Sequence, residues 1–151
     1  MRRLALLLLA GLLVLTMGLV LARAADAPIQ VQGAWARSTP MLPASGHMHG
    51  TTGAVYLTLR NSGATPDALV AATSDVAEAV ELHETVMEGT VMRMRPVARL
   101  ALPAGATLAM KPGGYHVMLI NLKRGLAPGD TISLTLSFAN AAPVVVDVPV
   151  R

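Results

Sequence analysis

The chain has 151 residues, the length of one domain, and carries 12 Lys and Arg against 9 Asp and Glu. A formal net charge of +3 suits an anionic partner such as nucleic acid, but Arg2, Arg3 and Arg23 precede residue 25. Residues 25–151 hold nine charges of each sign and are neutral, so the charge gives no support to nucleic-acid binding. The absence of cysteine excludes thiol catalysis, thiolate zinc sites, iron–sulfur clusters and blue-copper centres.

The N-terminus has the three parts of a secretory signal. Residues 1–3 are positively charged, residues 4–22 form an apolar run, and Ala22-Arg23-Ala24 is an A-x-A cleavage pattern. We therefore expect a signal peptide over residues 1–24 and one mature domain over 25–151. The alternative is an uncleaved membrane anchor, because the apolar run reaches the lower limit for a spanning helix. Both interpretations place the domain outside the cytoplasm, in a periplasmic or other extracytoplasmic space.

The rest of the chain alternates short apolar runs with turn residues. Runs of strand length occur at 29–36, 54–59, 115–122, 131–138 and 144–150, separated by Gly, Pro and Asn clusters. About eight to ten such strands in one domain predict an all-β sandwich or barrel. Only the segment from Ser74 to Val80 offers a helical turn, with Ser74 or Asp75 as its cap.

The histidines and methionines are concentrated in the predicted mature domain. All four histidines and seven of the nine methionines lie after residue 24. Methionine is a common filler of hydrophobic cores, and this ordinary explanation suffices for Met41 and Met110.

One candidate pair lies in a predicted hairpin. Glu88-Gly89 resembles the Asp-Gly dipeptide of a two-residue type I′ turn. A turn at this point places His83 directly opposite Met94, and opposed side chains have Cβ atoms ~4.5–5.5 Å apart. An imidazole and a thioether at that distance can share one metal ion. A register slip of one residue would put the two on opposite faces.

A second candidate pair lies on the predicted strand 115–122. His116 and Met118 are two residues apart, so they project to one face of a strand while their neighbours project to the other. Alone, such a pair is also typical of a half-buried strand. Together with His83 and Met94 it predicts a metal site of two imidazoles and two thioethers.

These four residues carry a resemblance to a known family. His83, Met94, His116 and Met118 reproduce the H-x10-M-x21-H-x-M pattern of the periplasmic copper chaperones called PCuAC. Similarity extends along the domain through Ala34-Trp35-Ala36-Arg37, Val80-Glu81-Leu82-His83, Met92-Arg93-Met94-Arg95-Pro96-Val97 and Pro112-Gly113-Gly114-Tyr115-His116. The chain departs from many members at Glu84, where they carry a methionine that is commonly treated as optional.

The resemblance implies a cupredoxin-like Greek-key β-sandwich that binds copper(I) outside the cytoplasm. It further implies delivery of copper toward the copper centres of cytochrome oxidase, to an oxidase subunit or a Sco-type thioredoxin-fold protein. Soft, neutral thioether ligands independently favour copper(I) over zinc. A periplasmic copper buffer and, in a different class, an adhesion or assembly sandwich without metal are the alternatives. No catalytic motif or paired carboxylates indicate an enzyme.

A further histidine pair lies in the long loop between residues 38 and 52. His47-Met48-His49 presents two imidazoles near glycines, and nitrogen ligands favour copper(II). We treat these three residues as a secondary copper(II) hypothesis, against the alternative of an exposed loop with no metal role.

Overall fold

The computed structural model describes residues 28–39 and 51–151, and this part of the chain contains strands and no helix. The predicted signal peptide and the His47-Met48-His49 loop lie outside the described residues. No membrane-spanning helix occurs in the part that is described. The ten strands are β1 (Ile29–Ala36), β2 (Thr52–Asn61), β3 (Asp67–Thr73), β4 (Ala77–Glu88), β5 (Val91–Pro96), β6 (Leu100–Leu102), β7 (Thr107–Met110), β8 (Tyr115–Leu122), β9 (Thr131–Phe138) and β10 (Val144–Pro149).

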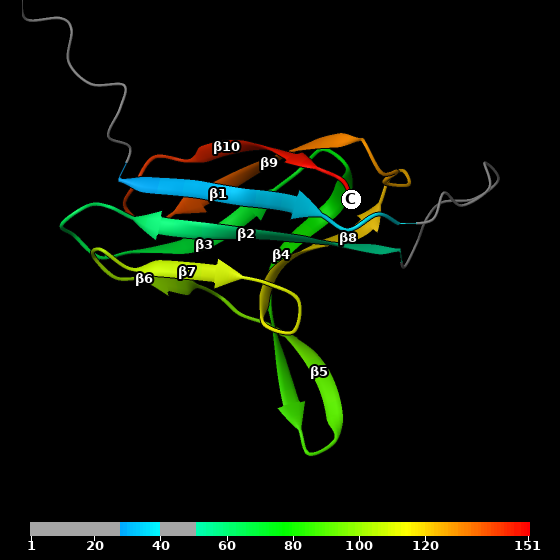
Figure 1. Cartoon of the computed structure of the whole chain (residues 1–151), viewed down its shortest axis with the longest axis horizontal. Helices are drawn as coiled ribbons and strands as arrows, with labels where there is room; N and C mark the ends of the chain where they lie inside the picture. Colours follow the sequence, from blue (N-terminus) through cyan, green and yellow to red (C-terminus); the bar gives the residue numbers. More distant parts are fainter. Residues whose placement is uncertain (1–27, 40–50) are drawn as a thin grey trace, which may run out of the picture.

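The strands form two antiparallel sheets that pack face to face (Figure 1). The larger sheet has the order β1-β2-β8-β4-β5, with β7 also paired to β2. The smaller sheet has the order β10-β9-β3-β6. The predicted all-β sandwich is therefore confirmed.

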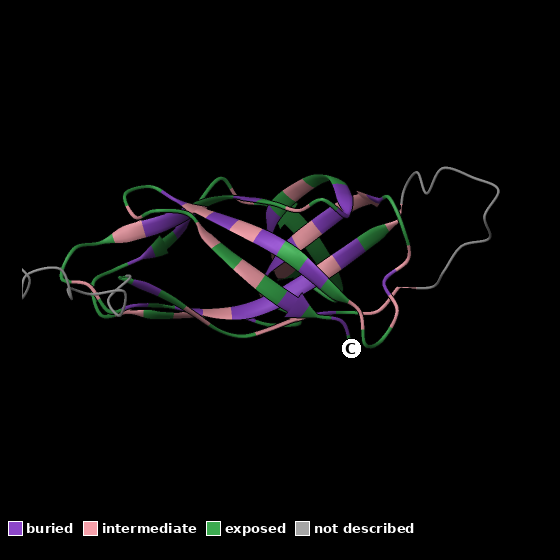
Figure 2. Ribbon diagram, turned by 90° about the horizontal axis from the view of Figure 1, so that it is seen from above, coloured by how far each residue is buried: buried purple, intermediate pink, exposed green. Residues whose placement is uncertain are grey.

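The core lies between the two sheets and follows from the alternation of each strand. On β8, Val117 and Leu119 are fully buried, and Leu134 and Leu136 of β9 are fully buried from the other sheet. Figure 2 shows this alternation as buried segments interspersed with exposed ones along single strands. Full burial of a leucine or valine side chain contributes about 1.5–3 kcal/mol, so these side chains hold the two sheets together.

The helical turn predicted between Ser74 and Val80 is wrong. The chain makes a tight turn at Asp75 and Val76, and the long strand β4 begins at Ala77. Val76 and Ala77 are both buried in the core. A capping residue is not sufficient for a helix here, because the following residues pair with β8 over most of the length of β4.

The β4–β5 hairpin of the larger sheet extends beyond the sandwich. The pairing of β4 with β8 ends at Glu84, which lies opposite Tyr115, and the remainder of β4 pairs only with β5. The β4–β5 hairpin consequently projects from the body of the protein (Figure 1). Every residue of β5 is exposed.

Candidate metal centre

The pairing of β4 with β8 brings two of the predicted ligands face to face. His83 lies directly opposite His116, and their ring centroids are 5.8 Å apart. Both residues are buried, with relative exposures of 8% and 3%. Two buried imidazoles in a cross-strand pair form the inner part of the candidate site.

The hairpin register differs from the predicted one. Its loop is Gly89-Thr90 rather than Glu88-Gly89, so Met94 lies opposite Thr85 and not opposite His83. Gly89 has a φ of +64°, whereas Thr90 has no positive φ. This is the type II′ pattern, with glycine at the first central position. The predicted type I′ turn at Glu88-Gly89 would have required a positive φ at Glu88 as well.

The corrected register still keeps Met94 on the same face as His83. The shift moves the pairing by two residues, and side chains two residues apart on a strand share a face. His83 is paired with Pro96, so Met94 lies diagonal to it, at the ~7–8 Å typical of diagonal neighbours. A long thioether side chain spans such a distance.

Met118 joins the same region from β8. It lies opposite Glu81 of β4 and shares a face with His116, two residues before it. Three of the four predicted ligands, Met94, His116 and Met118, line a single pocket of about 460 Å³. His83 does not line it but lies next to His116.

Hydrogen bonds fix which nitrogen of each ring can act as a ligand. His83 Nε2 donates to Glu81 Oε2 at 2.8 Å, and its Nδ1 is buried without any hydrogen-bond partner. His116 Nδ1 donates to the Gly114 carbonyl at 3.1 Å, which leaves the lone pair on Nε2. Metal-binding histidines typically bind the metal through one ring nitrogen and donate the N–H of the other to a carboxylate or a carbonyl.

Burial also shifts the pKa of the His116 imidazole. Desolvation lowers the pKa of His116 below the ordinary imidazole value, and the neighbouring His83 lowers it further. The hydrogen bond to Gly114 acts in the opposite direction and offsets part of this shift of the pKa. The lowered pKa favours the neutral form of His116, which is the form that binds a metal ion.

The set of donors fits a soft metal ion. In the described part of the chain, no three His, Asp or Glu side chains gather into a metal-binding group. The thioethers of Met94 and Met118 are the further donors beside the two imidazoles. Two imidazoles with two thioethers suit copper(I), whereas hard cations require oxygen ligands.

Aromatic side chains border the histidine pair. The Tyr56 ring lies 6.3 Å from that of His116, and the Trp35 ring lies 4.7 Å from that of Tyr56. The Arg151 guanidinium lies 6.0 Å from the centre of the Trp35 ring. Sequence reasoning assigned Trp35 and Tyr56 to the core or its rim and missed their proximity to the site, because that proximity depends on the pairing of β2 with β8.

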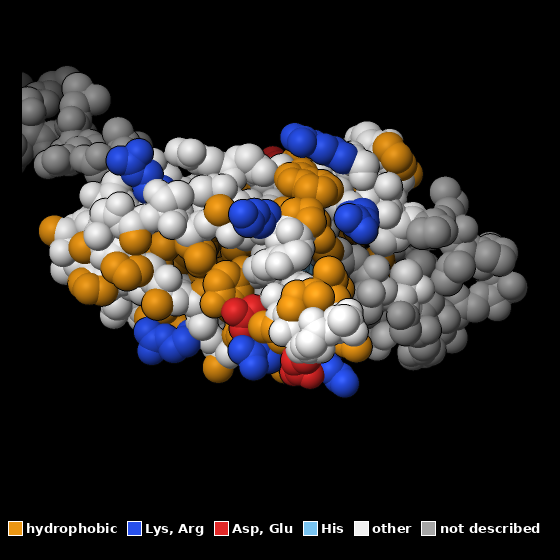
Figure 3. Space-filling view, turned by 60° about the horizontal axis from the view of Figure 1, so that its bottom comes forward, with side chains coloured by type: hydrophobic (Ala, Val, Ile, Leu, Met, Phe, Trp, Pro, Cys, Tyr) orange, Lys and Arg blue, Asp and Glu red, His pale blue; other side chains and the backbone are white. Residues whose placement is uncertain are grey.

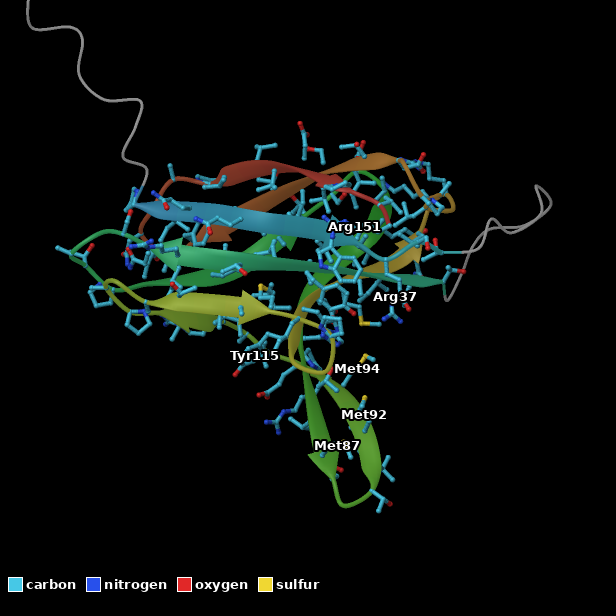
Figure 4. The ribbon with its side chains drawn as sticks, viewed as in Figure 1. Arg37, Met87, Met92, Met94, Tyr115 and Arg151 are labelled. Atoms are coloured by element: carbon cyan, nitrogen blue, oxygen red, sulfur yellow. The ribbon has the colours of Figure 1, made fainter. Side chains whose placement is uncertain are left out.

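Sequence reasoning also missed Glu81, the partner of His83. A recognisable signal was present, since Glu81 and His83 are two residues apart and share a strand face. Figure 4 shows the region where the pocket meets the hairpin, with Met94 at the base of the hairpin and Arg37 beside it. The exposed Arg37 also lines the pocket.

Comparison with known proteins identifies relatives over nearly the whole described chain. Residues 29–150 match the protein family described as "Putative lipoprotein LpqE-like". The "Putative lipoprotein Lxx21020" of Leifsonia xyli subsp. xyli is 36% identical over 124 residues, which cover 82% of this chain and 69% of that protein. The uncharacterized protein RP573 of Rickettsia prowazekii is 31% identical over 127 residues, covering 83% and 68%.

Solved structures show the same fold. The solution structure of copper(I)-bound DR1885 from Deinococcus radiodurans is 34% identical, with a TM-score of 0.64 and coverage of 85% of this chain and 81% of that one. The copper-bound PCuAC domain of PmoF2 is 25% identical, with a TM-score of 0.65 and coverage of 87% and 98%. The cupredoxin-like sandwich predicted from the sequence is thus confirmed, and the chain belongs to the LpqE-like family, with a domain of the PCuAC type.

Proposed function

We propose that this protein is an extracytoplasmic copper(I) chaperone that holds the ion with His83, Met94, His116 and Met118. The observation that carries the proposal is the buried Nδ1 of His83, which has no hydrogen-bond partner beside a second buried imidazole. A buried polar atom without a partner is costly, and a metal ion relieves that cost. The copper-bound states of DR1885 and PmoF2 support the choice of metal.

The arrangement suits transfer of the ion better than permanent storage. His83 and His116 are buried and held by the sheet, whereas Met94 is 59% exposed on the projecting hairpin. An incoming ligand from an acceptor protein reaches the Met94 side of the ion first. Thioethers need no deprotonation, so this exchange of ligands proceeds without moving a proton.

Glu81 contributes the charge that the four ligands lack. Two neutral imidazoles and two thioethers leave the single positive charge of copper(I) uncompensated. The Glu81 carboxylate accepts the hydrogen bond from His83 Nε2 and would offset this charge through the imidazole ring. It both orients the ring and makes the imidazole a better electron donor to the metal.

The place and the acceptor of the copper are further parts of the proposal. The predicted signal peptide and the lipoprotein name of the Leifsonia relative support export. The resemblance to PCuAC chaperones supports delivery toward cytochrome oxidase copper centres, through a Sco-type protein or an oxidase subunit. The protein acts by binding and release rather than by catalysis, and a copper buffer is the alternative in the same class.

Anaerobic competition with a chromogenic chelator tests the binding. We expect one tightly bound copper(I) per wild-type chain and strong weakening in His116→Ala. Met110→Leu is the control, because Met110 is a core residue on β7 and this substitution removes a sulfur outside the site. Wild-type protein that fails to bind copper(I) would favour the adhesion or assembly class.

Deletion of the gene separates delivery from buffering. A chaperone that supplies the oxidase is needed when copper is scarce, so we expect oxidase activity to fall at limiting copper and to recover at replete copper. A buffer instead protects against excess, and its loss would leave oxidase activity intact and lower tolerance to high copper.

A further inference from the structure

The projecting hairpin has two faces of different chemistry. On one face, Glu84 pairs with Arg95 at 3.0 Å and Glu88 pairs with Arg93 at 2.7 Å. The register puts Thr85, Met87, Met92 and Met94 together on the other face. One face therefore carries two ion pairs whose charges cancel, and the other face presents three thioethers.

Packing of the hydrophobic core does not explain the three methionines on the hairpin, because all three are exposed. Met87 and Met92 are each 61% exposed, and Met94 is 59% exposed. Methionine as a core filler is buried, as Met110 is. Met94 is one of the four proposed ligands, whereas Met87 and Met92 belong to no site described so far.

The geometry links these two residues to the inner site. Met87 lies directly opposite Met92, and opposed Cβ atoms are ~4.5–5.5 Å apart. Met92 lies two residues before Met94 on the same face, and both line the pocket that contains His116. Figure 4 shows Met94, Met92 and Met87 in succession from the base of the hairpin toward its tip.

We infer that Met87 and Met92 form an outer binding site for a soft monovalent cation, from which copper(I) passes to Met94 and the inner site. This inference rests on the proposed function and adds an entry step to it. In each step a bond from copper to the next sulfur or imidazole nitrogen forms as a bond to a previous ligand breaks. Copper stays in the +1 state, so no electron or proton is transferred.

The sulfur atoms of the pair, rather than its surroundings, favour a cation over a purely apolar partner. The acidic and basic residues of the opposite face neutralise each other, so the hairpin does not repel a positive ion. Figure 3 shows hydrophobic side chains gathered in the middle of this side of the molecule, with Lys and Arg on either side. An apolar docking surface would be served equally well by leucine, whereas a soft cation requires the sulfur.

Silver(I) titration of the purified protein, followed by NMR of labelled methionine methyl groups, tests the outer site. Silver(I) is a soft monovalent probe without redox chemistry. We expect the first equivalent to shift the signals of Met94 and Met118, and the second to shift those of Met87 and Met92. Methyl signals of Met87 and Met92 that stay unchanged through two equivalents would overturn the inference.

Two sets of variants separate the outer site from the inner one. Met87→Leu with Met92→Leu should lose the second equivalent and keep the first, while Val91→Leu on the opposite face should keep both. His83→Ala with His116→Ala should weaken the first equivalent and leave the response of Met87 and Met92. If the histidine variant instead keeps the first equivalent unchanged, the proposed function fails and the outer site still stands.

Loading kinetics decide between a sulfur site and an apolar surface. We expect the double leucine variant to take up copper(I) from a chelator about tenfold more slowly with unchanged final affinity, because the outer site no longer concentrates the ion near the pocket. A double serine variant should be slowed to the same degree. Normal loading by the leucine variant together with slow loading by the serine variant would show an apolar docking surface and overturn the inference.

Discussion

His83 and His116 are directly opposed on β4 and β8, with ring centroids 5.8 Å apart and both rings buried. The two strands that hold them are paired from Ala77 to Glu84, so the backbone of the sheet sets the separation of the imidazoles. A site on paired strands is more precisely organised than a site on loops. In the proposed site, Met94 on the exposed hairpin is therefore the ligand that is free to adapt to the ion.

The lowered pKa of His116 makes the metal-free protein sensitive to acid. The unfolded chain has an imidazole with pKa ~6.5 and takes up a proton before the folded protein does. The contribution to stability is therefore present above the unfolded pKa and is lost as the pH falls through the folded pKa. We expect the free energy of unfolding to decrease over this range in wild type and less steeply in His116→Asn. Urea unfolding of metal-free protein between about pH 8 and 5 measures it, and equal slopes for the two proteins would contradict the prediction.

Replacement of Glu81 tests its role behind the metal ligand. Glu81→Gln keeps the size of the side chain and an acceptor for His83 Nε2 but removes the negative charge. Loss of such a partner typically weakens metal binding by about 10–100-fold, and we expect a loss of copper(I) affinity in this range. Glu88→Gln is the matched control, since Glu88 pairs with Arg93 near the end of the hairpin and should leave the affinity unchanged. Equal affinities for both variants would remove Glu81 from the site.

Much of the fold could be predicted because several strands carry clear local signals. The runs at 29–36, 115–122 and 131–138 coincide with β1, β8 and β9, since alternation and flanking turn residues are both strong there. β6 and β7 have only three and four residues, too few for a period to be recognised. The helical turn at Ser74 was wrong because pairing of β4 with β8 overrides a local capping signal.

The candidate site could be predicted in composition but not in its pairings. The spacing of the four predicted ligands is a property of the sequence, but the opposition of His83 and His116 depends on which distant strands become neighbours. The hairpin register depends on which residue adopts a positive φ, and Gly89 does so as the first residue of the loop and not as the second. The proximity of Tyr56 to His116 follows from long-range pairing in the same way, whereas the contact between Glu81 and His83 is local to β4.

The hairpin turn itself is testable through Gly89. Its φ of +64° lies in a region that disfavours side chains, although nothing lies within 4 Å of a Cβ added there. Gly89→Ala should therefore destabilise the hairpin through backbone strain alone, by about 1 kcal/mol. Thermal unfolding measures the loss, with Thr90→Ala as the control in the same loop. An unchanged stability in Gly89→Ala would mean that the loop adopts another conformation.

The two kinds of ligand should respond differently to pH. His83 and His116 must be neutral to bind copper(I), so wild-type affinity should weaken as the pH falls through the range in which these imidazoles protonate. Because burial lowers the pKa of His116, we expect its share of this weakening below the ordinary imidazole range. Met94 and Met118 carry no titrating proton. Replacing both methionines by Ala should weaken binding at every pH and preserve most of the pH dependence.

Replacing both histidines by Ala should have the opposite signature. The thioethers alone make a poor site, so binding at neutral pH weakens, but no imidazole is left in the site to compete with protons and the dependence flattens. Copper(I) competition against a chelator from about pH 5 to 8 spans the imidazole pKa, with the chelator affinity corrected at each pH. A double-histidine variant that keeps the wild-type slope would show that other groups cause the proton dependence. His83 and His116 would then not be the ligands, and the unpartnered Nδ1 of His83 would need another explanation.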